Sequence, residues 1–503
     1  MRNQYIYIIG VVLVMSCCKA NAQQRSLMDS LCYRTEIQGT LASGDYNPLW
    51  LNANRYGLSS LKTANGYLRG ALERPLSVDD GRKWGVGYGL DVALAAGFTS
   101  TFVVQQAYME GRWLKGTLTV GAKEQPMELK NPELSSGPQT LGINARPVPQ
   151  VRMALPDFWT IPGTKNWLAL KGHIAFGKTT DDKWQKNYTC QQNRYTEGTL
   201  YHSKAGYLKI GPKHVTMTVG LEMASQFGGK SYLFENGVQQ VYENEGGIKG
   251  MMHALFYGGT DPVDGSFKNN EGNQLGSWVA RLDINQADWS LGLYADQFFE
   301  DYSMMVHVNK SGSGYFAYGF KDWMLGAELQ LKQMPWLQGI VMEYLYTKYQ
   351  GGPVYHDETT AIPNQISGRD NYYNHHLFTG WQHWGQVMGN PLYLSPLYNT
   401  DGTIEVKHNR FVAWHLGLNG SPAEGWNYRV LATWQKGYGS YYHVPIDPEK
   451  SLSLMTEIAY RFPRNGWAVK GALGLDSGKL RGDNFGVQVS VVKTGWLNLG
   501  KER

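Results

Sequence analysis

From about residue 277 to the C-terminus, apolar and polar residues alternate in stretches of roughly ten, joined by links that are alternately short and long. A period of two places successive side chains on opposite faces, so each stretch has one apolar face and one polar face. Examples lie within 323–332, 412–418, 428–434 and 467–475. The pattern predicts a transmembrane β-barrel, with tight turns at one end and long loops at the other.

The links support this prediction over a secreted β-sandwich or propeller, whose strands also alternate but whose loops do not segregate by side so regularly. Short links (285–288, 333–339, 419–425, 463–466) interleave with long ones (297–321, 348–410, 437–450, 476–484). Alternation also occurs earlier, within 84–96 and 215–223. We therefore expect an all-β fold consisting of one antiparallel outer-membrane barrel.

The N-terminus has the features of a secretory signal. Residues 1–22 combine Arg2, an apolar core over 5–15 and an Ala20-Asn21-Ala22 cleavage site. Acylation of Cys17 or Cys18, as in a lipoprotein, is an alternative with a poorer match at the preceding residues. We expect the mature chain, 23–503, to form a single barrel domain in the cell outer membrane.

The length of the mature chain, 503 − 22 = 481 residues, suits roughly 16 to 20 strands. Such a barrel leaves an interior too wide for wall side chains alone, so it holds water or a plug. An aromatic fraction of 13% agrees with rings of Trp and Tyr at the membrane interfaces, and we expect outer-membrane lipid around the wall. Cys32 and Cys190 remain after cleavage, and the sequence leaves open whether they form a disulfide.

Two segments interrupt the alternation. Residues 124–165 contain seven prolines and no sustained period. Because proline cannot donate a ladder hydrogen bond, we expect this segment to be a plug or lid rather than a central strand. Residues 348–410 are rich in His, Asn, Tyr and Trp. By the alternation of links they form a long extracellular loop region, with room for a further pair of strands.

Three irregular strings resemble the Wzi-type capsule assembly family, especially its Bacteroides-like members: Asn47–Gly57 (NPLWLNANRYG), Ser135–Val151, and the block from Gly368 to Leu392. The resemblance spans nearly the whole mature chain. It implies a closed barrel of about eighteen strands that binds capsular polysaccharide at the cell surface, with other capsule export components as further partners. One departure is that residues 23–45 show no strong helical period, whereas helices occlude the periplasmic mouth in the family's best-known form.

The long loop region supplies candidate sugar-binding residues. Sugar rings stack on aromatic faces, and their hydroxyls pair with amide, carboxylate or guanidinium groups. The candidates are Arg369, Asp370, Tyr372, Tyr373, Trp381, His383 and Trp384. Such aromatics also occur in barrels as interfacial rings or loop packing. A second set, Asn144, Arg146 and Arg152, either contacts ligand or, as we favour, anchors the proline-rich segment to acidic residues on the inner wall.

Motifs for nucleophilic, zinc or nucleotide chemistry are absent from the sequence. His375, His376 and His383 form the best histidine group, but their spacing does not define a closed metal site. We therefore expect no enzyme activity, no metal and no cofactor. A formal net charge of +5 without a basic run gives no reason to expect nucleic acid. The alternatives kept open are a substrate-selective porin or sugar channel and, less favoured, an outer-membrane lipase or protease.

Overall fold

A computed structural model describes residues 30–235, 237–262, 271–300, 305, 321–356, 359–361 and 368–497. Eighteen strands form one antiparallel barrel, as the alternation predicts. Its strands are β1 (Leu31–Ser43), β2 (Ala64–Arg74), β3 (Trp84–Ala96), β4 (Phe102–Trp113), β5 (Gly116–Ala122), β6 (Gln150–Thr160), β7 (Leu168–Lys178), β9 (Leu200–Ile210), β10 (Val215–Phe227), β13 (Asn273–Asn285), β14 (Trp289–Glu300), β15 (Trp323–Leu331), β16 (Gly339–Tyr346), β19 (Phe411–Ala423), β20 (Trp426–Gly437), β21 (Glu449–Arg461), β22 (Trp467–Ser477) and β23 (Asn484–Leu497).

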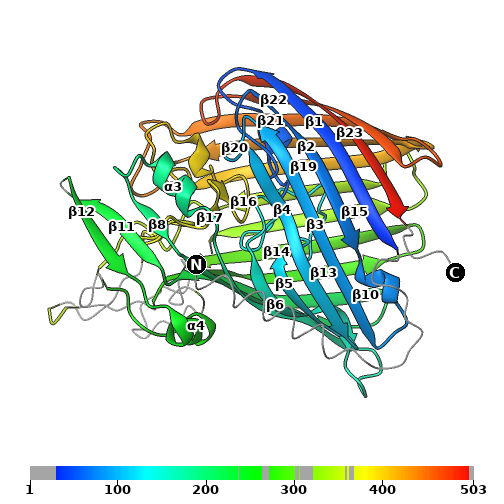
Figure 1. The fold of residues 1–503 in the computed structure, drawn as a ribbon, viewed down its shortest axis with the longest axis horizontal. Helices are drawn as coiled ribbons and strands as arrows, with labels where there is room; N and C mark the ends of the chain where they lie inside the picture. The colour runs from blue at the N-terminus through cyan, green and yellow to red at the C-terminus, as the bar shows by residue number, and fades with distance from the viewer. Residues whose placement is uncertain are drawn as a thin grey trace.

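The barrel closes between its first and last strands. β1 pairs with β2 on one side and with β23 on the other (Figure 1). In the pairing with β23, Leu31 lies opposite Leu497. Each consecutive pair is antiparallel, for example Gly339 opposite Asn419 between β16 and β19. Closure leaves no barrel strand with an unpaired edge, which is what a sheet in lipid requires. The predicted fold class is confirmed.

Link lengths differ between the two ends. At the end where β1 begins and β23 ends, which we call the short-turn end, no link is longer than the nine residues 75–83. The opposite end, which we call the long-link end, carries the long connections 123–149, 228–272 and 347–410. Figure 1 shows α3, α4 and the small sheet at the long-link end, away from the arrowhead of β23.

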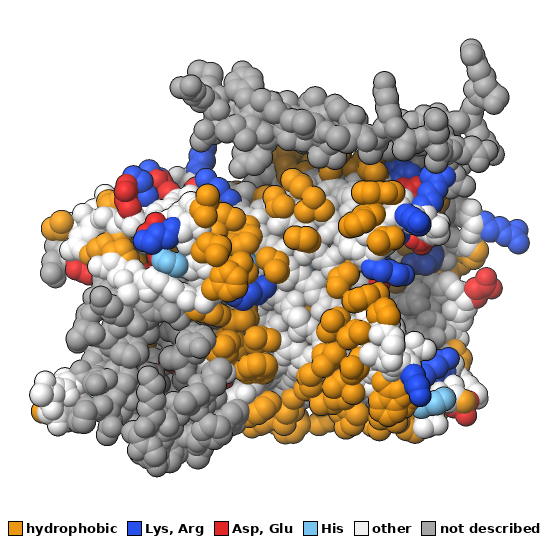
Figure 2. Space-filling model, turned by 90° about the horizontal axis from the view of Figure 1, so that it is seen from below, with side chains coloured by type: hydrophobic (Ala, Val, Ile, Leu, Met, Phe, Trp, Pro, Cys, Tyr) orange, Lys and Arg blue, Asp and Glu red, His pale blue; other side chains and the backbone are white. Residues whose placement is uncertain are grey.

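The outer wall is apolar because every second side chain of a strand faces outward. On β1, Ile37 and Leu41 are 58% and 71% exposed, whereas the inward-facing Gln38 and Thr40 are buried. Figure 2 shows hydrophobic side chains over much of the coloured wall, with charged side chains mainly toward its ends. Exposed tryptophans gather at the short-turn end: Trp84, Trp113, Trp159, Trp167, Trp289, Trp336, Trp426, Trp467 and Trp496. They form one interfacial aromatic ring.

The other elements belong to links. They are α2 (Leu49–Asn52), η1 (Leu76–Asp79), α3 (Asp182–Tyr188), α4 (Gly247–Phe256), η2 (Pro396–Tyr398), a sheet of β8 (Tyr195–Glu197), β11 (Lys230–Glu235) and β12 (Val238–Glu243), and a two-stranded pair of β17 (Gln382–His383) and β18 (Gln386–Val387). Among the described residues, no helix has the length and apolar character needed to span a membrane. The expected signal sequence, 1–22, lies outside the described residues.

The end of the proline-rich segment corrects one expectation. Residues 150–160 are not part of a plug but form β6, which pairs with β5 and β7. The ladder tolerates Pro156 because the register with β7 shifts between Leu155 and Trp159, where no pairing is made. A proline therefore lies at a bulge rather than in a continuous ladder. Residues 161–167 form a short turn.

Three links from the long-link end fold into the barrel: 44–63, 123–149 and the described part of 347–410. We call them together the plug. Their apolar side chains pack with inward-facing strand residues into the largest hydrophobic cluster, which includes Trp50, Leu134, Trp381 and, from the wall, Leu275 and Val341. The core of this protein thus lies inside the barrel. No barrel strand lies within the described part of 347–410, so the further pair allowed for in the sequence is not present there.

Candidate functional site

The aromatic residues of the long loop region lie in the barrel interior. Tyr372, Tyr373 and Trp381 are 1%, 0% and 0% exposed. The Trp381 ring stacks on Tyr201 of β9 at 5.7 Å, and Tyr373 stacks on Tyr393 at 4.0 Å. Each polar tip has a protein partner, because a buried hydroxyl or indole N–H without one is costly.

Those partners join the plug to itself and to the wall. Trp381 Nε1 donates to the carbonyl of Thr140 at 2.9 Å, and the Tyr373 hydroxyl donates to the carbonyl of Gln139. The Tyr372 hydroxyl donates to Asp322 at 3.0 Å. Burial raises the pKa of Asp322 to about 6, despite three donors. The sequence predicts these rings near a sugar-binding surface; in the structure all three side chains are buried and packed against other residues.

Charged contacts fix the proline-rich link to the wall. Lys130 Nζ lies 2.7 Å from Asp296 of β14, and each side chain is 1% exposed. Glu343 of β16 accepts from the Ser135 hydroxyl at 2.5 Å and from the Ser136 backbone N–H at 2.8 Å. Removing either partner of the buried Lys130–Asp296 ion pair should destabilise the protein, because the other charge is left buried and unpaired. The link is therefore anchored by acidic groups of the wall.

The residues predicted to provide that anchoring act differently. Asn144 donates to the carbonyl of Val387 at 3.0 Å, so it joins two parts of the plug. Arg146 donates to Thr99 Oγ1 at 2.9 Å, and its guanidinium lies 4.5 Å from the Trp384 ring. Burial lowers the pKa of Arg146 to about 10. Arg152 is a barrel residue of β6, opposite Thr119 and Ala175.

His383 and Trp384 lie near the long-link end. Buried His383 Nδ1 lies 2.9 Å from the Arg146 carbonyl, and the Thr180 backbone N–H donates to Nε2 at 3.1 Å. Burial lowers the pKa of His383, so the ring is neutral at pH 7. Trp384 is half-buried, and its Nε1 donates to Thr180 Oγ1 at 3.2 Å. Of this pair, only Trp384 has ring surface in contact with solvent.

Arg369 and Asp370 are also partly exposed at the long-link end. The Arg369 guanidinium lies 5.2 Å from the ring of Tyr442, which is 58% exposed. Next to Tyr442, Tyr441 stacks under the guanidinium of Arg410 at 3.9 Å. We call Arg369, Arg410, Tyr441 and Tyr442 the outer patch. It offers aromatic faces and guanidinium donors on the surface, the combination predicted for the buried tyrosines.

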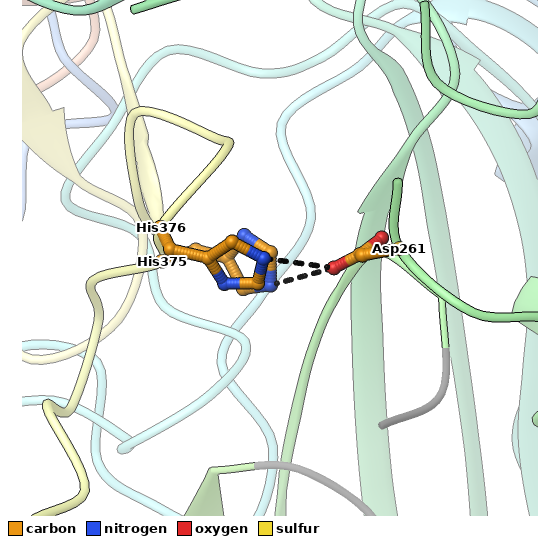
Figure 3. Close-up of side chains that lie close together, drawn as sticks. All are labelled: Asp261, His375 and His376. Atoms are coloured by element: carbon orange, nitrogen blue, oxygen red, sulfur yellow. Dashed lines mark ion pairs between the residues drawn. The ribbon is translucent and has the colours of Figure 1, made fainter. Parts of the chain in front are cut away.

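The histidines His375 and His376 meet Asp261, which follows α4. Their Nε2 atoms lie 3.4 and 3.5 Å from Asp261 Oδ2, and the two side chains point toward the carboxylate (Figure 3). These three residues are grouped closely enough to hold a metal ion. However, His375 Nδ1 accepts from the Leu377 backbone N–H at 3.1 Å. A metal-bound imidazole instead donates from its second nitrogen, so the geometry favours hydrogen bonding over metal ligation.

Protonation of His376 is opposed by its surroundings. Burial, with His375 4.2 Å away ring to ring, lowers the pKa of His376 to about 4. The contacts of His375 and His376 with Asp261 join the loop after α4 to the plug.

The two described cysteines, Cys32 and Cys190, are free thiols rather than a disulfide.

The two wall acids that anchor the proline-rich link are not among the residues predicted from sequence. Asp296 and Glu343 are acids on the inward faces of strands with apolar neighbours. An acid in the polar half of a barrel strand is ordinary, so the sequence gives no sign that it binds a plug. To predict that Asp296 pairs with Lys130, or Glu343 with Ser135, one must know which loop enters the barrel.

Two solved structures are reported as similar to this chain. The structure of Escherichia coli Wzi, an outer membrane protein involved in group 1 capsule assembly and a carbohydrate-binding β-barrel, has a TM-score of 0.53 at 14% identity, covering 91% of this chain and 83% of that chain. Pseudomonas aeruginosa OprD has a TM-score of 0.45 at 11% identity, covering 95% and 98%. No family model and no curated protein matches the sequence. At these identities the likeness concerns the fold.

Proposed function

We propose that this protein is a Wzi-type, largely closed outer-membrane barrel that binds capsular polysaccharide and holds it at the cell surface. The observation that carries the proposal is the filled lumen. An 18-stranded barrel is wide enough to conduct, yet three links occupy its interior and bond to strands around its circumference. Examples are Trp50 to Thr433 of β20, Thr140 to Ser277 of β13, and Leu49 to Asp476 of β22.

A filled barrel presents its function at its ends rather than through its interior. The long-link end, which we assign to the cell exterior, carries the outer patch and the half-buried Trp384. A repeating polymer gains strength from several weak contacts of this kind through avidity, so no catalytic group is needed. Sugar binding is proposed for Arg369, Asp370 and Trp384 together with Tyr442, and not for the buried tyrosines.

The family assignment is supported by the three irregular strings and their position. Asn47–Gly57 and Ser135–Val151 lie wholly or largely in the plug, and the block from Gly368 to Leu392 also lies there. The strings that resemble the Wzi-type family are therefore the parts that fill the lumen. The fold likeness to Wzi, described as carbohydrate-binding, agrees with this assignment. Other capsule export components are proposed as partners on the same basis.

Single-channel recording in planar bilayers separates the proposal from its main alternative, a substrate-selective porin. The purified protein should insert without steady ohmic steps at moderate voltage. Stable conductance of porin size in the native protein would contradict the closed barrel. Folding is verified in the same preparation by the heat-dependent shift in gel mobility that folded barrels show.

Capsule retention tests the biological role. A strain lacking the gene should shed capsule into the medium, and the native gene should restore it to cells. A gene carrying Arg369→Ala and Tyr442→Ala should restore the barrel to the membrane with less bound capsule. Unchanged cell-bound capsule in the deletion strain, with none shed, would refute the role.

A further inference from the structure

The space between the plug and the short-turn end is a polar cavity, which we call the vestibule. Its volume is about 570 Å³, within the range of small-molecule sites. The plug forms its inner limit through Trp50, Arg55 and Tyr56. The ends of the strands form its walls, as with Arg429 of β20 and Arg461 of β21. The vestibule therefore faces the short-turn end, opposite the outer patch.

Cations in the vestibule outnumber carboxylates. The cations are Arg34, Arg55, Arg69, Arg429, Arg461 and Lys470; the carboxylates are Glu36, Glu124, Glu133 and Glu457. Two pairs are local: Arg34 contacts Glu36, and Arg69 contacts Glu124 as well as Asp91. The remaining cations gather on the side formed by β20, β21 and β22.

Most of the cations on the β20–β22 side interact with a single carboxylate, that of Glu457. Glu457 lies 3.3 Å from Arg429 and 3.9 Å from Arg55, and it also interacts electrostatically with Lys470. Among the described residues, neither Arg461 nor Lys470 makes an ion pair. A cluster with this excess of positive charge in a partly enclosed site attracts an anion.

Arg55 supplies the second, independent observation. Its Nε and Nη2 atoms are buried, and neither makes a hydrogen bond among the described residues; Nη2 lies only within ion-pair distance of Glu457, at 3.9 Å. A buried guanidinium donor without a hydrogen bond carries its full desolvation penalty, which exceeds the net gain from a typical hydrogen bond, so such an arrangement is uncommon. A carboxylate or phosphate presents oxygen atoms in the geometry that a guanidinium binds.

We propose that the vestibule binds a small saccharide bearing a carboxylate or phosphate group, with Arg55, Arg429 and Lys470 as the anion-binding side chains. Trp50 and Tyr56, together with Tyr67, give the vestibule aromatic surface. Amide and hydroxyl groups such as Asn54, Asn419 and Ser490 provide partners for sugar hydroxyls. This site is separate from the surface binding proposed above, and it faces the opposite end of the barrel.

The test is calorimetric titration of the purified, folded barrel in a zwitterionic detergent at low salt. Glucuronic acid, glucose 6-phosphate, inorganic phosphate and neutral glucose are titrated separately. Binding of either acidic sugar with at least tenfold higher affinity than glucose is expected, weakening as salt rises. Competition by phosphate identifies the anion as the recognised group. Equal binding of glucose and both acidic sugars, or binding of none, would overturn the proposal.

Variants locate the site. Arg55→Gln and Lys470→Gln should each weaken acidic-sugar binding at least fivefold. Lys230→Gln, which removes an exposed cation of β11 far from the vestibule, is the matched control and should bind as the native protein does. If Arg55→Gln fails to fold, Arg429→Gln replaces it, since Arg429 is also proposed to bind the anion and lines the same cavity. Unchanged affinity in the Lys470 and Arg429 variants would place any binding elsewhere and refute this site.

Discussion

Lys130 of the plug and Asp296 of the wall form an ion pair of 2.7 Å in which each side chain is almost completely buried. Removing Asp296 alone leaves an uncompensated ammonium in the barrel interior. We expect Asp296→Asn to destabilise plug docking by roughly 3 to 5 kcal/mol. The double variant Lys130→Met, Asp296→Asn should recover much of that loss. The readouts are the temperature at which gel mobility shifts and the frequency of channel openings.

The exposed pair Lys230–Glu243 in the small sheet is the matched control. Its removal should change neither readout, because surface pairs contribute little. If Asp296→Asn behaves like this control, the ion pair does not hold the plug.

Deleting the proline-rich link should open the barrel. Because Gly121 of β5 pairs with Gln150 of β6, a short Gly-Ser turn can replace residues 123–149 without disturbing the strands. We expect steady ohmic conductance, since strands of this number enclose an aqueous channel when no plug is present. The comparison is a variant in which the exposed link 438–448 is shortened. A deletion variant that folds and remains silent would show that the other two links close the lumen by themselves.

Replacing the buried Trp381 or the exposed Tyr442 by alanine should distinguish a residue that stabilises the barrel from one that binds capsule. Trp381→Ala should destabilise the barrel by roughly 3 to 5 kcal/mol because it leaves a large cavity beside Tyr201. Tyr442→Ala should leave the melting temperature within about 2 °C, since little packing is lost at the surface. Capsule binding in pull-down assays should fall for Tyr442→Ala. Retained binding in that variant would remove Tyr442 from the sugar-binding site.

Acid should loosen the plug through His408. Burial and the neighbouring Arg481 lower the pKa of His408 to about 4, from an ordinary value near 6.5. The unfolded chain therefore takes up a proton first as pH falls. The contribution of neutral His408 to the free energy of unfolding is fully present above pH 6.5. It declines between pH 6.5 and pH 4, and at pH 5 about 1 to 2 kcal/mol has been lost.

The corresponding measurement compares thermal transitions at pH 7.5 and pH 5 for the native protein and His408→Gln. The native protein should lose more stability than the variant over this interval. Equal losses would assign the acid sensitivity to other groups.

The barrel was predictable because strand alternation is local. The inward and outward faces of 323–331 or 467–477 can be read from the residues themselves, and Asn465-Gly466 marks a turn. The burial of Tyr372 and Trp381 was not predictable, because it depends on contacts with distant residues: Asp322 lies 50 positions from Tyr372, and Thr140 lies 241 positions from Trp381. β6 was missed for a different reason: the register shift that accommodates Pro156 has no sequence signature.

The candidate site was predicted only in part. The sequence identifies Arg369 and Trp384 as possible binding residues, and the structure places both at the accessible end. It gives no indication of Tyr442, which lies in a separate link and meets Arg369 only in the folded chain. Arg55 appears in sequence merely as part of a family-like string. Its unpartnered donors become visible once the plug is folded against β21.

The pairing of β1 with β23 also determines when the barrel can close during folding. Leu31 and Leu497 meet at the seam, so the barrel cannot close before nearly the whole chain has been made. Until then both strands are open edges, which readily pair with other chains. Contacts this distant in sequence form slowly. Substitutions that delay plug docking should therefore lengthen the life of an aggregation-prone intermediate and lower the yield of barrel, even where the finished protein is stable.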